Sequence, residues 1–161
     1  ATGEMTPGDE VAPIEIASGK KVGITICYEA IFPEISRRLK QAGATFLVNI
    51  TNDGWYLNTS APYQHFQMNI ARAIENRLPV VRAANTGISA IINPLGEVAS
   101  ASPLNTRLAL GGQIEEFKRI DFFPWELSQK MFPWLCAGFT LVLIIARLYF
   151  NPIERGRWWL V

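Results

Sequence analysis

The chain has 161 residues and a nearly balanced charge, with 15 Lys and Arg against 14 Asp and Glu. This balance argues against a nucleic-acid partner, because proteins that bind nucleic acid carry a basic surface. The length is sufficient for one domain with its own core, and the two cysteines, Cys27 and Cys136, lie in surroundings too different to indicate a disulfide framework.

The first ten residues, ATGEMTPGDE, are rich in Gly, Pro and acidic side chains and begin with alanine. They are typical of the middle of a loop, and no signal peptide precedes the first predicted strand. We therefore expect the chain to be a fragment of a longer protein. A short strand is predicted over residues 12–17, and residues 18–20 form a turn.

A buried strand rich in β-branched residues is predicted over residues 21–27, and it ends at Cys27. A turn and a helix over residues 34–41 follow, with Pro33 and Glu34 suited to the start of the helix. A thiol at this junction lies at the edge of a sheet, where the N-terminal field of the helix favours thiolate. Cys27 is therefore either a nucleophile or, like most free cysteines, a small core residue.

Residues 45–50 predict a second buried strand, parallel to the first and next to it. The loop that follows emerges at the same sheet edge as Cys27, where open α/β sheets bind their ligands. Its candidate substrate-binding residues are Asn52, Trp55 and Tyr56, although Asn-Asp-Gly also makes an ordinary solvated turn. Residues 55–63 are a candidate lid or membrane-dipping arm, with ordinary loop packing as the alternative.

A helix is predicted over residues 62–78, with an apolar stripe of Tyr63, Phe66, Ile70 and Ile74. The side chains expected to face water are Arg72, Glu75 and Arg77. We interpret the single histidine, His65, as a structural, hydrogen-bonded side chain rather than a catalytic one. No spacing of His, Cys, Asp and Glu suits a metal ion, so neither a metal nor a cofactor is expected.

The next segments predict an antiparallel β-meander. Its strands are residues 79–84, 88–92 and 97–101, with tight turns at Asn85-Thr86-Gly87 and Asn93-Pro94-Leu95-Gly96. Asn85 either approaches the site or only shapes its turn. A last strand is predicted over residues 108–117.

Residues 132–150 are apolar except for Arg147, and as a helix they extend about 28 Å, close to the roughly 30 Å bilayer core. We predict a transmembrane helix over residues 129–151 and a short polar and aromatic tail over 152–161; the alternative is a buried core helix. Aromatic residues that resemble interfacial belts flank the stretch: Phe132, Trp134, Tyr149, Trp158 and Trp159. Lys and Arg are equally frequent on both sides, so charge does not decide orientation.

Five segments resemble the nitrilase, or carbon–nitrogen hydrolase, superfamily. They are ICYE (26–29), NDGW (52–55), SAPYQH (60–65), RAANTGIS (82–89) and PLG (94–96). Within it, they are similar to the membrane-bound acyltransferases that complete bacterial lipoproteins, in which a membrane helix follows the nitrilase domain. The resemblance implies an αββα sandwich, with residues 1–128 as the C-terminal part of the domain, and a Glu–Lys–Cys catalytic triad.

The resemblance makes Cys27 the nucleophile. Tyr28 and Glu29 match the two residues after it, which would supply an oxyanion-hole N–H and support for the site. The triad's glutamate and lysine lie upstream of the cysteine in the family, and the upstream charged residues here stand in the wrong context: Glu4, Glu10, Lys20 and Lys21. We therefore expect this chain to be inactive alone.

The implied reaction uses a phospholipid as acyl donor, a Cys27 thioester as intermediate and the diacylglyceryl-cysteine of an apolipoprotein as acceptor. The implied location is the bacterial inner membrane, with the nitrilase-like domain on the periplasmic side. Two alternatives remain open. One is an amidase acting on a small amide, against which the apolar stretch argues, and the other is an inactive membrane-anchored module.

Overall fold

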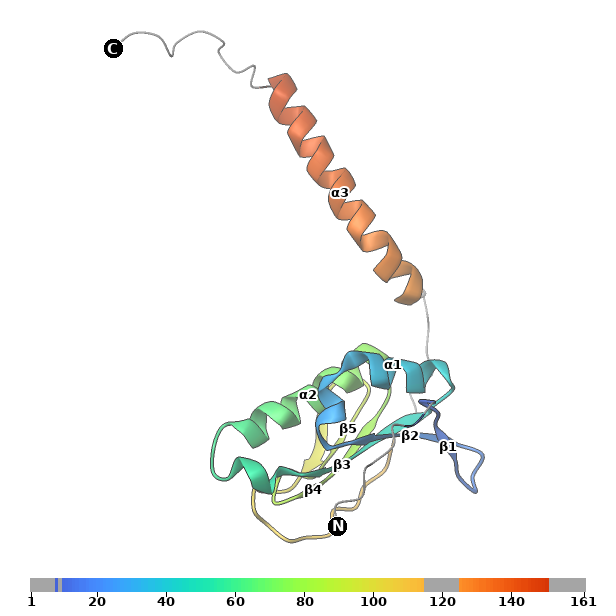
Figure 1. Ribbon diagram of the computed structural model, residues 1–161, viewed down its shortest axis with the longest axis vertical. Coiled ribbons are helices and arrows are strands. Elements are labelled where there is room, and N and C mark those ends of the chain that lie inside the picture. Colours follow the sequence, from blue (N-terminus) through green and yellow to red (C-terminus); the bar gives the residue numbers. More distant parts are fainter. Residues whose placement is uncertain (1–7, 9, 115–124, 151–161) are drawn as a thin grey trace, which may run out of the picture. The chain divides into compact units, whose positions relative to one another are not determined.

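A six-stranded mixed sheet organises the first unit of the chain (Figure 1). The computed structural model describes residues 8, 10–114 and 125–150. The chain divides into two units, Ala1–Lys118 and Arg119–Val161, and each is described by itself. The order of the strands in the sheet follows the sequence: β1 (Ile14–Glu15), β2 (Lys21–Ile26), β3 (Phe46–Asn52), β4 (Val80–Asn85), β5 (Ala90–Ile92) and β6 (Val98–Ala101).

The three central strands, β2, β3 and β4, are parallel, and the others pair antiparallel. Helix α1 (Pro33–Gln41) connects β2 to β3, and helix α2 (Ala61–Asn76) connects β3 to β4. Parallel neighbours need such crossovers. Short 3₁₀ turns, η1 (Cys27–Ile31) and η2 (Asp53–Tyr56), follow β2 and β3. The predicted βαβ unit and antiparallel meander are therefore confirmed.

Both helices cover the same face of the sheet (Figure 1). The core lies between them and the strands and includes Leu39, Leu47, Phe66, Ala73 and Ile92. Gly23 allows this close packing, since a Cβ there would come within 2.7 Å of Leu47 and 3.1 Å of Leu39. Among the described residues there is one sheet with helices on one face. They correspond to one half of the αββα sandwich, in agreement with a nitrilase-like α/β fold.

The predicted surface of α2 was partly wrong. Arg72 is buried, at 6% exposure, whereas Ile74 is 42% exposed and Tyr63 is also exposed. The reason is that the buried side of the helix carries polar residues beside the apolar Phe66 and Ala73. These polar residues stand at helical spacing and are His65, Asn69, Arg72 and Asn76. Arg72 donates to the carbonyl of Ile31 in η1 at 2.8 Å and pairs with Glu75 Oε1 at 2.7 Å, so its buried charge is compensated.

Several predicted boundaries also change. The first strand shortens to two residues, and β3 extends through Asn52. Helix α2 ends at Asn76, because Arg77 takes a left-handed φ of 52° and Leu78 precedes a proline. The strand predicted over 108–117 is absent from residues 108–114, where the Gly111–Gly112 pair weakens strand formation; residues 115–117 lie outside the described part.

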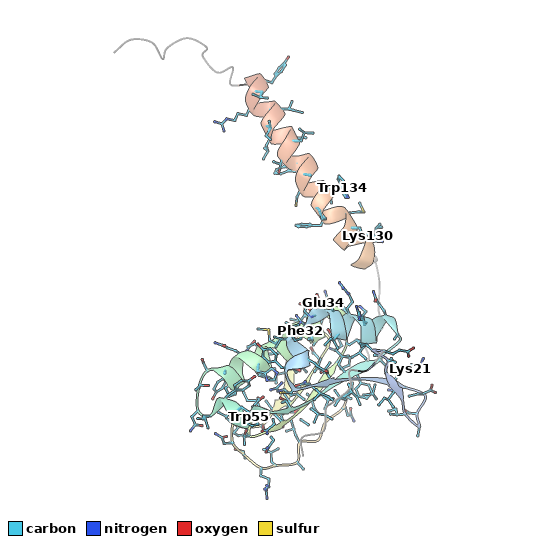
Figure 2. The ribbon with its side chains drawn as sticks, in the orientation of Figure 1. Lys21, Phe32, Glu34, Trp55, Lys130 and Trp134 are labelled. Atoms are coloured by element: carbon cyan, nitrogen blue, oxygen red, sulfur yellow. The ribbon has the colours of Figure 1, made fainter. Side chains whose placement is uncertain are left out.

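The second unit contains helix α3 (Trp125–Phe150), which begins before the predicted span. Its segment Lys130–Tyr149 has a mean hydropathy of 1.9 and is long and apolar enough to cross a membrane. In the described structure this segment is not buried, unlike a core helix. Figure 2 shows Lys130 and Trp134 on this helix. The predicted tail over 152–161, with Trp158 and Trp159, lies outside the described residues.

Candidate active site

Cys27 occupies a strained turn immediately after β2. Its φ is 50°, in the left-handed region that residues other than glycine rarely adopt. The residue is half-buried and is the first residue of η1. Glu29 stabilises the turn, because its Oε2 accepts a hydrogen bond from the Ile26 N–H at 2.8 Å. The turn therefore displays a thiol at the carboxyl edge of the parallel strands, as the sequence predicted.

The Cys27 carbonyl contacts a network of buried polar side chains. His65 Nε2 lies 3.2 Å from this oxygen, and Asn49 Nδ2 donates to it, also at 3.2 Å. Because a carbonyl can only accept, Nε2 is the donor in this contact when it carries a proton. The other ring nitrogen, Nδ1, lies 2.9 Å from Asp53 Oδ1. His65 thus links α2, η2 and the turn at Cys27, which confirms its interpretation as a hydrogen-bonded side chain.

The network rests on an ion pair between Arg82 and Asp53. Their side chains are fully buried, and Arg82 Nη2 lies 2.7 Å from Asp53 Oδ2. Arg82 also donates to Asn49 Oδ1 at 2.7 Å and to the Ile88 carbonyl at 3.1 Å. Burial lowers the pKa of Arg82, and the attraction of Asp53 opposes this shift. Arg82 therefore fixes both residues that reach toward the Cys27 turn, Asn49 directly and His65 through Asp53.

Aromatic rings enclose His65. The Tyr56 ring lies edge-on at 5.9 Å and the Tyr28 ring is tilted at 6.1 Å, between centroids. Burial raises the pKa of the Tyr56 phenol, and the nearby Cys27 and Asp53 raise it further. Tyr56 is therefore kept neutral close to the thiol. Trp55, in contrast, is 84% exposed and contributes to no such contact in the described structure; Figure 2 shows it on η2.

The sheet register brings two other predicted residues together. Asn52 of β3 pairs with Asn85 of β4, and the Asn85 amide donates to Asn52 Oδ1 at 3.2 Å. The same oxygen accepts the Gly54 N–H at 3.1 Å, so both asparagines shape the η2 loop. Beside them lies a cavity of about 300 Å³, lined by Asp53, Gly54, Leu57, Asn58, Pro62, Thr86 and Asn105.

Sequence reasoning missed the residues beneath the cysteine, namely Asn49, Asp53 and Arg82. One signal was present: Asn49 and Arg82 stand inside otherwise apolar strands, at positions whose neighbours two residues away face the core. Within the described residues there is no group of three or more His, Cys, Asp or Glu able to hold a metal ion. The described side chains hold the backbone on both sides of the turn at Cys27 by hydrogen bonds.

Known proteins resemble the chain over most of its length. The model of the carbon–nitrogen hydrolase family matches residues 3–114. An apolipoprotein N-acyltransferase of Geobacter metallireducens is 42% identical over 145 residues, and one of Rickettsia bellii is 48% identical over 101. These alignments cover 89% and 63% of this chain but 27% and 20% of the relatives. The chain therefore spans about a quarter of their length.

A solved structure agrees on the fold. The crystal structure of a carbon–nitrogen hydrolase from Helicobacter pylori G27 superposes with a TM-score of 0.57 at 21% sequence identity. The superposition covers 63% of this chain and 43% of that one. At this identity the likeness concerns the fold alone, and it agrees with the sheet and helix order described above.

Proposed function

The chain belongs to the carbon–nitrogen hydrolase family, and on that premise we propose that it carries the nucleophile of an apolipoprotein N-acyltransferase. The observation that carries the proposal is the alignment with proteins of that name, which covers 89% of the chain in one case and so extends beyond the matched family domain. The turn at Cys27 and the apolar helix α3 support it, because this chemistry needs an activated thiol and lipid substrates.

The first step is acylation of Cys27. The thiol gives its proton to a general base, and the sulfur attacks the carbonyl carbon of the sn-1 ester of a phospholipid. The ester C–O bond then breaks, and the lysophospholipid leaves with the proton returned by the base. A thioester on Cys27 remains. The family resemblance makes the base a glutamate and adds a lysine, both of which we assign to parts of the intact protein other than this chain.

The second step transfers the acyl group to an amine. The α-amino group of a diacylglyceryl-cysteine on an apolipoprotein attacks the thioester carbonyl, and the C–S bond breaks. The amine loses a proton, which restores the Cys27 thiol through the same base. The products are an N-acylated lipoprotein and the free enzyme, so the two substrates react in turn at a single thiol.

Both steps pass through a tetrahedral oxyanion. We assign the Tyr28 backbone N–H to the oxyanion hole, since this donor follows the nucleophile directly. Losing one such donor typically slows a reaction by about 10²–10³-fold. Glu29, which accepts the Ile26 N–H, would hold the turn in place. Asn52, Asn85, Trp55 and Tyr56 would shape the substrate loop above the thiol.

Lipid substrates require the thiol to work close to a bilayer. We propose that α3 spans the bacterial inner membrane and that the catalytic unit faces the periplasm. The apolar segment Lys130–Tyr149 supports the membrane anchor. The side of the membrane is inferred from the family resemblance, because the charges that flank the helix do not distinguish the two orientations.

The chain contains a matched control for the test. In the intact protein, Cys27→Ala should abolish acyl transfer from phosphatidylethanolamine to a diacylglyceryl-cysteine lipopeptide, whereas Cys136→Ala, which removes the exposed thiol of α3, should leave it near wild type. Transfer is followed by the mass of the lipopeptide. Full transfer by Cys27→Ala would contradict the proposal, and hydrolysis of a small amide without acyl transfer would favour an amidase.

A further inference from the structure

One peptide group joins the buried network to the proposed oxyanion hole. The carbonyl of Cys27 and the N–H of Tyr28 belong to the same planar, trans peptide, so they point in opposite directions. The carbonyl is directed toward the buried donors His65 Nε2 and Asn49 Nδ2. The N–H is therefore directed away from the core, and in the first turn of η1 it has no acceptor within the helix.

The two donors are held firmly. Asn49 is fully buried and His65 is 4% exposed, so neither exchanges its hydrogen bond with bulk water. Arg82 donates to Asn49 Oδ1 at 2.7 Å, and His65 Nδ1 lies 2.9 Å from Asp53 Oδ1 and 3.3 Å from Arg82 Nη2. Since Asp53 is itself paired with Arg82, the positions of both Asn49 and His65 depend on the buried guanidinium of Arg82. The carbonyl cannot rotate without breaking this network.

Hydrogen bonds to a carbonyl also change the other end of the peptide. Donors on the oxygen polarise the amide and make its N–H a stronger donor, because hydrogen bonds in a chain reinforce one another. The effect is larger in a buried site, where the effective dielectric constant is low. Orientation and polarisation therefore act in the same direction on the Tyr28 N–H.

We propose that His65 and Asn49 are positioning residues that aim and polarise the Cys27–Tyr28 peptide for oxyanion binding. They do so without touching the substrate or the sulfur. The inference rests on the proposed function of Cys27 as a nucleophile, and it deepens that function by assigning a task to the network beneath the cysteine.

Two reactions of the Cys27 thiol distinguish a loss of oxyanion stabilisation from a general disruption of the site. Acylation of Cys27 by a p-nitrophenyl ester passes through an oxyanion, whereas alkylation by iodoacetamide displaces iodide and forms none. In the intact protein, His65→Phe removes one donor. Asn49→Asp keeps the acceptor for Arg82 and removes the other donor, together with the contacts of that Nδ2 with the carbonyl and Oγ1 of Thr25. Each change should slow acylation by about 10-fold or more, which is a smaller effect than the direct loss of an oxyanion donor. The rate of alkylation should stay within about twofold of the wild-type rate.

Two further variants serve as controls. His65→Gln restores an N–H near the position of Nε2, so it should recover most of the acylation rate. Asn76→Ala removes another buried donor of α2, one that bonds Ser36 rather than Cys27, and should not change the ratio of acylation to alkylation. Equal acylation and alkylation losses in both His65→Phe and Asn49→Asp, or no loss of acylation in either, would overturn the positioning role.

Failure of the proposed function gives a different result. If Cys27→Ala still released nitrophenolate in a burst, the thiol would not be the nucleophile, and the function itself would fall. If Cys27→Ala abolished the burst while His65→Phe and Asn49→Asp behaved like wild type, the function would stand and only the positioning role would be wrong. If His65→Phe does not fold, Asn49→Asp decides the question with the same two reactions.

Discussion

At the scale of single residues, the site depends on a buried ion pair rather than on the cysteine alone. Asp53 and Arg82 have fully buried side chains, and breaking such a pair typically costs about 3–5 kcal/mol because one charge stays buried without its partner. Burial lowers the pKa of Arg82 and the Asp53 carboxylate raises it, so the two side chains are electrostatically coupled. The space around this pair is correspondingly tight.

Gly87 offers a direct test of that tightness. A Cβ at this position would overlap the carboxylate of Asp53, so Gly87→Ala should push Asp53 away from Arg82. We expect a loss of about 1–3 kcal/mol in the free energy of unfolding, as for other overpacked core sites. Denaturant unfolding of the intact protein measures it.

The matched control is Gly111→Ala, because a Cβ at Gly111 meets nothing within 4 Å. Its effect should stay within about 0.5 kcal/mol. Equal stability of the Gly87→Ala and Gly111→Ala variants would show that the Asp53–Arg82 pair tolerates displacement.

The residue scale also shows what the sequence could reveal. Cys27 was identifiable because a β-branched strand ends on it before a turn and a helix. Arg82 was not, because its partner Asp53 lies 29 residues earlier and no local pattern joins them. The same holds for Asn49, whose role depends on the register of β3 against its neighbours. The roles assigned to all the site residues remain predictions: Cys27, Tyr28, Glu29, Asn52, Trp55, Tyr56 and Asn85.

At the scale of elements, α2 explains why the amphipathic interpretation failed in part. Its buried side includes polar residues as well as apolar ones, because His65, Arg72 and Asn76 each contact an acceptor on a neighbouring segment. Hydrophobic periodicity assigns such residues to the solvent-exposed face, because it depends on hydropathy alone and not on the hydrogen-bond partners that other segments provide. The presence of the helix was predictable from the spacing of its apolar residues. The face that it buries, however, depends on its contacts with η1 and α1.

Helix α3 carries a prediction at this scale. Leu141→Arg places a charge near the middle of the segment Lys130–Tyr149 and should make membrane insertion less favourable by about 2.5–3.5 kcal/mol. A glycosylation reporter fused to the helix in microsomes measures the inserted fraction. Leu127→Arg, in the same helix but outside this segment, is the control and should leave insertion nearly unchanged. Equal insertion of both variants would contradict a spanning role.

At the scale of the whole molecule, the sheet has two different faces. The helices cover one face, whereas Ile26 and Ile50 pair in register on the other and are 63% and 52% exposed. In the αββα sandwich implied by the family resemblance, this face would pack on a second sheet. The order of elements and the parallel core were predictable because hydrophobic periodicity and crossover length determine them. The strand predicted over residues 108–117 was wrong for residues 108–114.

The central claim is that Cys27 becomes acylated, and the most direct measurement is the mass of the intact protein after incubation with a phospholipid and no acceptor. We predict an added acyl chain on the tryptic peptide that contains Cys27, removed by neutral hydroxylamine as expected for a thioester. Adding a diacylglyceryl-cysteine lipopeptide should also discharge it. An unmodified Cys27 in a protein that still transfers acyl chains would contradict the account.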